Sequence, residues 1–133
     1  MWLFTRYGFY SISVMAGSEM TCVRARLNRH LQALHYRFVR LRRCEITICK
    51  AKDYRYRMLV PRHAWESAML VLVREQTWSN FKSEVAEFNG LDDYQESLHG
   101  IWQIMRGVQA RGERNVRELS GRPRTRRRER PIL

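Results

Sequence analysis

The sequence lacks any apolar run near the length of about 20 residues that a membrane-spanning helix needs, which argues against an integral membrane protein. Cysteine is scarce, and Cys22, Cys44 and Cys49 fit neither a CxxC pair nor a zinc-ribbon spacing. An odd number of cysteines is typical of reduced thiols in the cytosol. Arg6 and Ser11 interrupt the apolar N-terminus, so we expect no signal peptide and a cytoplasmic protein.

The motifs of common enzyme classes are also missing. The sequence has no Gly-rich phosphate loop, no GxSxG turn and no cysteine with a histidine partner at motif spacing. Its nearest histidine pair, His30 and His35, lies five residues apart, whereas ligands on one helix face lie three or four apart. We therefore expect no metal and no cofactor. Enzyme activity is uncertain, and a non-enzymatic role is favoured.

Acidic residues are few, because 13 Asp and Glu stand against 25 Lys and Arg, which gives a net charge of +12. The excess is uneven. Residues 21–62 carry twelve basic and two acidic side chains, whereas residues 63–110 carry three basic and seven acidic ones. Residues 111–133 are basic again, with nine arginines and three glutamates. Such separation creates a strong local field and predicts an anionic partner.

Hydrophobic periodicity predicts four strands, at residues 9–14, 21–26, 44–50 and 54–60. Apolar residues recur at helical spacing over residues 27–39 and 62–76. Within the second of these, the unbroken apolar run 69–73 leaves a buried strand as the alternative. Ser79 is expected to cap a short helix that Gly90 ends. Asp92 with Gln95 resembles a capping box before a last helix.

These elements predict an α+β domain over residues 1–110. Two strand-strand-helix units form a four-stranded, mostly antiparallel sheet with helices on one face, and two further helices follow. From Ala110 onward the periodicity fades, and glycines and prolines lie among arginines. Residues 111–133 are therefore predicted to be a flexible basic tail, with a short helical turn near residues 113–119.

Several short motifs along residues 1–109 resemble a widespread, uncharacterised family of small bacterial proteins. They are Trp2-Leu3-Phe4-Thr5, Gly8-Phe9-Tyr10-Ser11, Val23-Arg24-Ala25-Arg26, Asp53-Tyr54-Arg55-Tyr56-Arg57, Asn80-Phe81-Lys82, and Leu98-His99 with Trp102. The resemblance implies a cytoplasmic bacterial α+β protein and implies no activity. This chain departs from the family at Thr77-Trp78-Ser79, where an acidic Asp-Tyr pair is usual, and in its basic extension.

Arginines alternate with apolar residues on two of the predicted strands. If Arg24 and Arg26 share a sheet with Arg55 and Arg57, all four guanidinium groups can point away from the helices. Guanidinium groups bind phosphate through two parallel hydrogen bonds and stack on bases, and open sheet faces bind single-stranded RNA. The alternative is a solvated sheet face on which the arginine side chains lie flat, with their apolar stems on the protein surface and their guanidinium groups in water.

Further basic residues extend the predicted surface. Arg37 and Arg40 lie in or near the first helix, and the tail holds Arg122, Arg124, Arg126, Arg127 and Arg128. A flexible polycation adds non-specific, salt-sensitive affinity for nucleic acid. The alternative is an unselected extension in arginine-rich coding sequence. A membrane surface is less favoured, because no lipidation signal or apolar anchor accompanies the charge.

Aromatic residues are expected mainly in the core. Tyr54 and Tyr56 alternate with the strand arginines, which places them on the opposite face. The arginine face is therefore expected to lack the aromatic platforms of single-strand RNA-binding sheets.

The sequence favours a small non-enzymatic cytoplasmic protein that binds nucleic acid, RNA before DNA. The second hypothesis is a protein-interaction module that pairs with an acidic partner, or with its own acidic half as a homodimer. A distant third is a metal-free ribonuclease that uses His99 and Lys82. Against the third stands the simpler interpretation that His99 packs beside Trp102 on a helix face.

Overall fold

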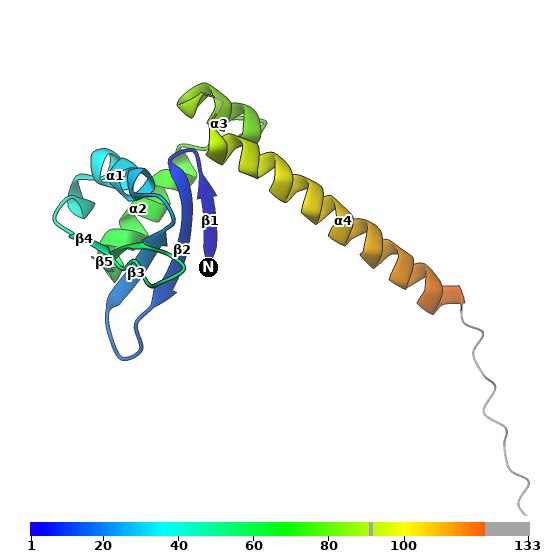
Figure 1. Cartoon of the computed structure of the whole chain (residues 1–133), viewed down its shortest axis with the longest axis horizontal. Coiled ribbons are helices and arrows are strands. Elements are labelled where there is room, and N and C mark those ends of the chain that lie inside the picture. Colours follow the sequence, from blue (N-terminus) through cyan, green and yellow to red (C-terminus); the bar gives the residue numbers. More distant parts are fainter. Residues whose placement is uncertain (91, 122–133) are drawn as a thin grey trace, which may run out of the picture. The chain divides into compact units, whose positions relative to one another are not determined.

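A computed structural model of the chain describes residues 1–90 and 92–121 (Figure 1). It contains two compact units, Met1–Gln95 and a second that begins at Glu96. The fold is α+β, as the sequence predicts, with an antiparallel sheet and four α-helices in the described part of the chain. None of the helices described is both long and apolar enough to cross a lipid bilayer.

The sheet has five strands rather than the four predicted, and its order is β1-β2-β3-β5-β4. All neighbouring strands are antiparallel. The strands are β1 (Trp2–Thr5), β2 (Gly8–Val14), β3 (Met20–Ala25), β4 (Ile46–Ile48) and β5 (Tyr56–Pro61). β1 is the additional strand, and it forms one edge of the sheet.

The prediction misses β1 because the strand is short and its turn lacks an Asn-Gly or Asp-Gly signal. Two residues, Arg6 and Tyr7, connect β1 to β2. The Thr5 hydroxyl stabilises this turn, because it donates to the Gly8 carbonyl and accepts from the Tyr7 N–H, both at 3.1 Å. The turn fixes a register in which Phe4 lies opposite Phe9.

The two predicted strand-strand-helix units are confirmed. The first comprises β2, β3 and α1 (Asn28–Arg37), and the second comprises β4, β5 and α2 (Arg62–Arg74). A 3₁₀ turn, η1 (Val39–Leu41), follows α1. The run 69–73 is helical, so the buried-strand alternative for it is wrong. β3 pairs with β5 and thereby joins the two units into one sheet.

The core lies between one face of the sheet and the helices α1 and α2 (Figure 1). Alternate strand residues point into it, as the period of two requires. The sheet contributes Tyr10, Ile12, Val23, Ala25, Met58 and Val60, and the helices contribute Leu31, Leu34, Ala64, Trp65, Ala68 and Leu72. The residues between them on each strand form the opposite face of the sheet.

Two further helices follow, α3 (Phe81–Asn89) and α4 (Asp93–Gly121). Asn80, and not Ser79, caps α3, because its side chain accepts from the Ser83 N–H at 3.2 Å. Gly90 ends this helix with a φ of 75°, as predicted. Asp92 accepts from the Gln95 N–H at 2.9 Å at the start of α4, also as predicted.

Helix α4 extends beyond the predicted domain boundary at residue 110. Residues 111–121 continue this helix, and they include residues 113–119, where the sequence predicts a helical turn. Side-chain contacts one turn apart support this stretch, for example the hydrogen bond from Gln109 to Glu113 at 3.1 Å. The tail arginines Arg122, Arg124, Arg126, Arg127 and Arg128 lie outside the described residues.

Gly8 allows the sheet and α1 to approach closely. Its φ of +147° is accessible essentially only to glycine, and a Cβ at this position would lie 2.3 Å from His30 Cγ. We expect Gly8→Ala to lower the free energy of unfolding by roughly 2–4 kcal/mol, because backbone strain and a steric clash coincide. Urea denaturation followed by tryptophan fluorescence measures the change.

Gly17→Ala is the matched control. Gly17 also has a positive φ, +69°, but no atom lies within 4 Å of the added Cβ. We expect Gly17→Ala to lower the free energy of unfolding by only about 1 kcal/mol. Equal losses for the two variants would contradict the close approach of His30 to Gly8.

Candidate nucleic-acid interface

The sheet face turned away from α1 and α2 carries a pair of arginines on neighbouring strands. Arg24 on β3 and Arg57 on β5 lie directly opposite each other in the register. Both side chains alternate with buried core residues, and both are partly exposed. The structure therefore brings these two predicted site residues together on the uncovered face.

Neutral groups hold both guanidinium groups in place. Arg24 Nη2 donates to the Ser11 hydroxyl at 2.8 Å, and Arg57 Nε donates to the Tyr54 carbonyl at 3.3 Å. Among the described residues, no carboxylate lies within 4.0 Å of either guanidinium. Like charges directly opposite each other destabilise a sheet, so this pair retains a concentrated positive charge at a cost in stability.

A row of aromatic rings lies beside the arginine pair. The Phe4 and Phe9 rings stack with centroids 4.5 Å apart, and Trp2 meets Phe9 edge-on at 5.8 Å. Trp2 is 70% exposed. The prediction that the arginine face lacks aromatic residues is wrong, because it omits β1. The four residues Trp2–Thr5 show no clear alternation of apolar and polar side chains, so the sequence carries little signal for this strand.

Tyr54 also belongs to this face, contrary to the prediction. Strand β5 begins only at Tyr56, so strand alternation does not extend back to Tyr54. The Tyr54 ring centroid lies 6.2 Å from that of Phe9, and the Arg24 and Arg26 guanidinium carbons lie 5.3 and 4.5 Å from it. These are cation–π distances. We call the surface made of Trp2, Phe4, Phe9, Arg24, Tyr54 and Arg57 the open face.

Other arginines of the predicted site are held by carboxylates. Arg26 binds both Asp53 oxygens, at 2.6 and 3.1 Å, and this contact lowers the pKa of Asp53. Arg37 forms an ion pair with Glu75. Their charges are largely compensated, so they add less to the field of the open face than the sequence suggests.

The side chains of two more predicted residues, Arg55 and Arg40, make no hydrogen bond or ion pair within the described part of the chain. Arg55 precedes β5 and is exposed, and its carbonyl accepts from the Cys49 N–H at 2.7 Å. Arg40 is exposed in η1, which lies between α1 and β4 in the chain. The predicted convergence of arginines from two hairpins therefore applies to Arg24 and Arg57, with Arg26 beside them on the Tyr54 ring.

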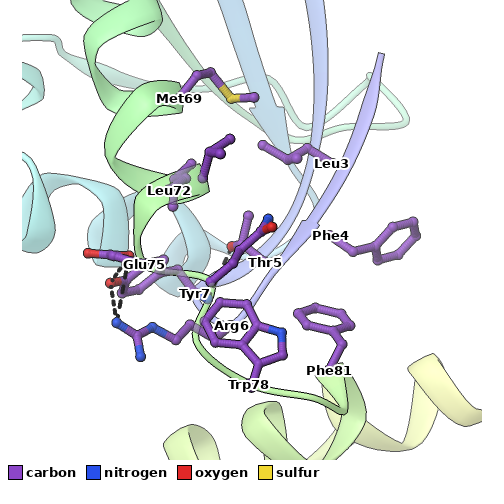
Figure 2. A pocket seen from close by; sticks show the side chains of 12 residues that line it. Leu3, Phe4, Thr5, Arg6, Tyr7, Met69, Leu72, Glu75, Trp78 and Phe81 are labelled. Carbon is purple, nitrogen blue, oxygen red and sulfur yellow. Dashed lines mark hydrogen bonds and ion pairs between the residues drawn. The ribbon is translucent and has the colours of Figure 1, made fainter.

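A cavity of about 260 Å³ lies where β1 ends (Figure 2). Its walls come from β1, the turn that follows it, the C-terminal part of α2 and the segment before α3. Figure 2 shows Arg6, Tyr7 and Glu75 on one side of the cavity and Phe4 and Phe81 on the other. The lining also includes Leu3, Leu72, Val73, Gln76 and Trp78.

Acidic residues of the second half of the chain are partly used within the fold. Glu75 pairs with Arg6 and Arg37, and Glu84 pairs with Arg6. Asp92 pairs with Arg29 at 2.9 Å. The negative charge of residues 63–110 therefore compensates basic residues of the same chain.

The ribonuclease hypothesis requires His99 to act with Lys82. Lys82 belongs to α3 in the first unit, and His99 belongs to the second unit. The His99 ring stacks on Trp102 at 5.8 Å, as the simpler interpretation predicts, and its Nε2 lies 3.3 Å from the Gln103 amide nitrogen. These contacts within α4 agree with a structural role for His99.

No protein-family model, curated protein or solved structure matches the chain. The resemblance to the family of small bacterial proteins therefore stays a prediction. The geometry of the open face and of the cavity is the basis for the functional proposals below.

The fold shifts the pKa of the buried His30. His30 lies between Gly8 and the Tyr94 ring, and burial, followed by the charge of Arg29, lowers its pKa from 6.5 to about 4. The unfolded chain therefore binds more protons between these pH values, and the free energy of unfolding rises with pH across this window. We expect His30 to contribute up to roughly 3 kcal/mol at neutral pH, lost as the pH falls from 6.5 towards 4.

Urea denaturation at pH values from 4 to 7.5 measures this dependence. His30→Asn removes the titration and keeps an acceptor for the Phe9 N–H, so its stability should vary less with pH. His63→Asn, at an exposed position, should keep the wild-type profile. An unchanged profile for His30→Asn would show that His30 is not the group responsible.

Proposed function

We propose that the protein binds single-stranded nucleic acid, RNA in particular, on the open face. The observation that carries the proposal is the in-register pair of Arg24 and Arg57, free of carboxylate partners among the described residues and adjoined by stacked aromatic rings. Phosphates would bind the two guanidinium groups, and bases would stack on Trp2 and Phe9.

Single strands fit this surface better than a duplex does. Aromatic rings on a sheet bind the flat faces of bases, and those faces are accessible only where bases are unpaired. Trp2 is the most exposed ring of the row, whereas Tyr54 is buried beneath Arg24 and Arg26. Trp2 would therefore provide the stacking platform, and Tyr54 would hold the arginine side chains in position.

Other basic residues would act at longer range. The tail arginines Arg122, Arg124, Arg126, Arg127 and Arg128 would add non-specific affinity that falls as salt rises. Arg26 and Arg37 already face carboxylates, so their contribution would be smaller. We propose no enzymatic step and no cofactor for this activity.

The double substitution of Arg24→Gln and Arg57→Gln tests the arginine pair. We expect the dissociation constant for a fluorescein-labelled 12-nucleotide RNA to rise at least about tenfold at low salt. The slope of log affinity against log salt should fall by about 2, because two phosphate contacts are lost. Fluorescence anisotropy at four salt concentrations measures both quantities.

The double substitution of Arg43→Gln and Arg74→Gln is the control, because it removes the same charge at exposed positions outside the strands. It should leave most of the affinity intact. If both double variants lose affinity equally, net charge governs binding and the open face is not the site.

Trp2→Ala tests the stacking platform. Since Trp2 is 70% exposed, its removal should change stability little. The binding free energy should fall by about 1–3 kcal/mol, the contribution of one stacked base, with an unchanged salt slope. Trp2→Phe keeps a ring and should restore most of the affinity. Full affinity in Trp2→Ala would exclude stacking on this residue.

A protein-interaction module is the second candidate function, and α4 is the observation that favours it. Met105, Val108 and Val116 recur at near-helical spacing along this helix and are 58%, 45% and 66% exposed. Such a stripe is typical of helices that pack against a partner. Self-association without nucleic acid, seen by light scattering at low and high salt, is the signature that distinguishes this function.

A further inference from the structure

The cavity beside β1 adjoins the open face through a shared residue. Phe4 lines the cavity and also stacks on Phe9 in the aromatic row. Trp78 and Phe81 lie across the cavity from Leu72 and Met69, as Figure 2 shows. A strand whose bases lie along the aromatic row would therefore reach this cavity without leaving the protein surface.

The size of the cavity limits what it can hold. Its volume of about 260 Å³ is slightly below the roughly 300–1,000 Å³ of pockets that bind drug-sized molecules. One flat ring system is the appropriate occupant for a space of this size. The walls that Leu3, Leu72, Val73 and Trp78 provide are apolar or aromatic, which suits the two faces of such a ring.

The charges at the cavity compensate one another. Arg6 Nη1 donates to Glu84 at 2.8 Å, and Arg6 Nη2 lies 3.6 Å from Glu75. Glu75 in turn accepts from the Tyr7 hydroxyl at 2.9 Å and pairs with Arg37. No net charge remains for a phosphate, so the occupant is a neutral group.

Arg6 Nε is a buried donor without a hydrogen-bond partner among the described residues, and Gln76 is a second polar group available to an occupant. Gln76 lines the cavity and is exposed, and its side-chain amide makes no hydrogen bond to any other residue that the structure describes. An amide offers one acceptor and two donors, the combination that recognises the edge of a base.

We infer that this cavity holds one unpaired nucleobase of the strand that the open face binds. The inference rests on the proposed function and adds a position of base recognition to it. The base enters between the apolar walls while its phosphate remains outside, towards the open face. Binding is then restricted to strands that can turn one base out of the stack, as single-stranded RNA does.

Filling the cavity tests the inference. Val73 lines the cavity and is 56% exposed, so Val73→Trp should occupy the space without disturbing the core. Leu70→Trp is the matched control, because Leu70 lies on the same helix, is 51% exposed and does not line the cavity. Two labelled 12-mers serve as probes, an RNA of mixed sequence and an abasic chain of the same length.

We expect Val73→Trp to weaken binding of the RNA by roughly 5- to 150-fold, the range for one stacked base, while Leu70→Trp binds like the wild type. All three proteins should bind the abasic chain with equal affinity, because it has no base that a filled cavity could exclude. Equal RNA affinity of Val73→Trp and wild type would overturn the cavity inference and leave the open face as the site. Equal losses on both probes would also overturn it.

Failure of the proposed function has a different signature. If the wild-type protein does not bind the RNA at low salt, the open face does not bind nucleic acid, and the cavity inference is overturned with it. Circular dichroism and urea denaturation of both tryptophan variants establish that they are folded before the affinities are compared.

Discussion

β3 and β5 pair from Met20 and Pro61 at one end to Ala25 and Tyr56 at the other, and this pairing holds the two strand-strand-helix units together. On one side of the sheet it places Val23 beside Met58, both fully buried beneath the helices. On the other side the same register places Arg24 opposite Arg57. The apolar burial on the first side offsets the repulsion on the second, since a fully buried side chain of this size contributes about 1.5–3 kcal/mol.

The arginines of this chain differ in function according to the groups that they contact. The position of an arginine in the sequence does not reveal those contacts. Arg6, Arg26, Arg29, Arg37 and Arg62 each have a carboxylate partner, and the pairs of Arg6, Arg29 and Arg37 connect segments that are far apart in the chain. Arg24 and Arg57 have neutral partners instead. A high net charge therefore indicates a preference for polyanions only in general terms, whereas the pair of Arg24 and Arg57, with no carboxylate in contact among the described residues, defines a place on the surface.

The sequence was sufficient to predict most of the fold, because hydrophobic periodicity and capping residues act locally. The alternation in β3 and β5, the Gly90 helix end and the Asp92 cap were all predicted from neighbouring residues. The site was predicted less well, because it depends on contacts between distant segments. The pairing of Arg37 with Glu75 and the position of Tyr54 beside Phe9 bring together residues far apart in the chain.

The aromatic half of the site depends on the turn that the sequence did not reveal. β1 carries Trp2 and Phe4, and only its pairing with β2 places these rings beside Phe9. At Gly8, the first residue of β2 after that turn, the missing Cβ leaves room for the buried His30 of α1. The Tyr94 hydroxyl donates to the Thr5 carbonyl at 2.8 Å, so the last residue of β1 is also held from outside the sheet. The packing of His30 and Tyr94 on the covered face thus holds β1 in place, and β1 supplies aromatic rings of the open face. A change at Gly8 would therefore affect both stability and binding.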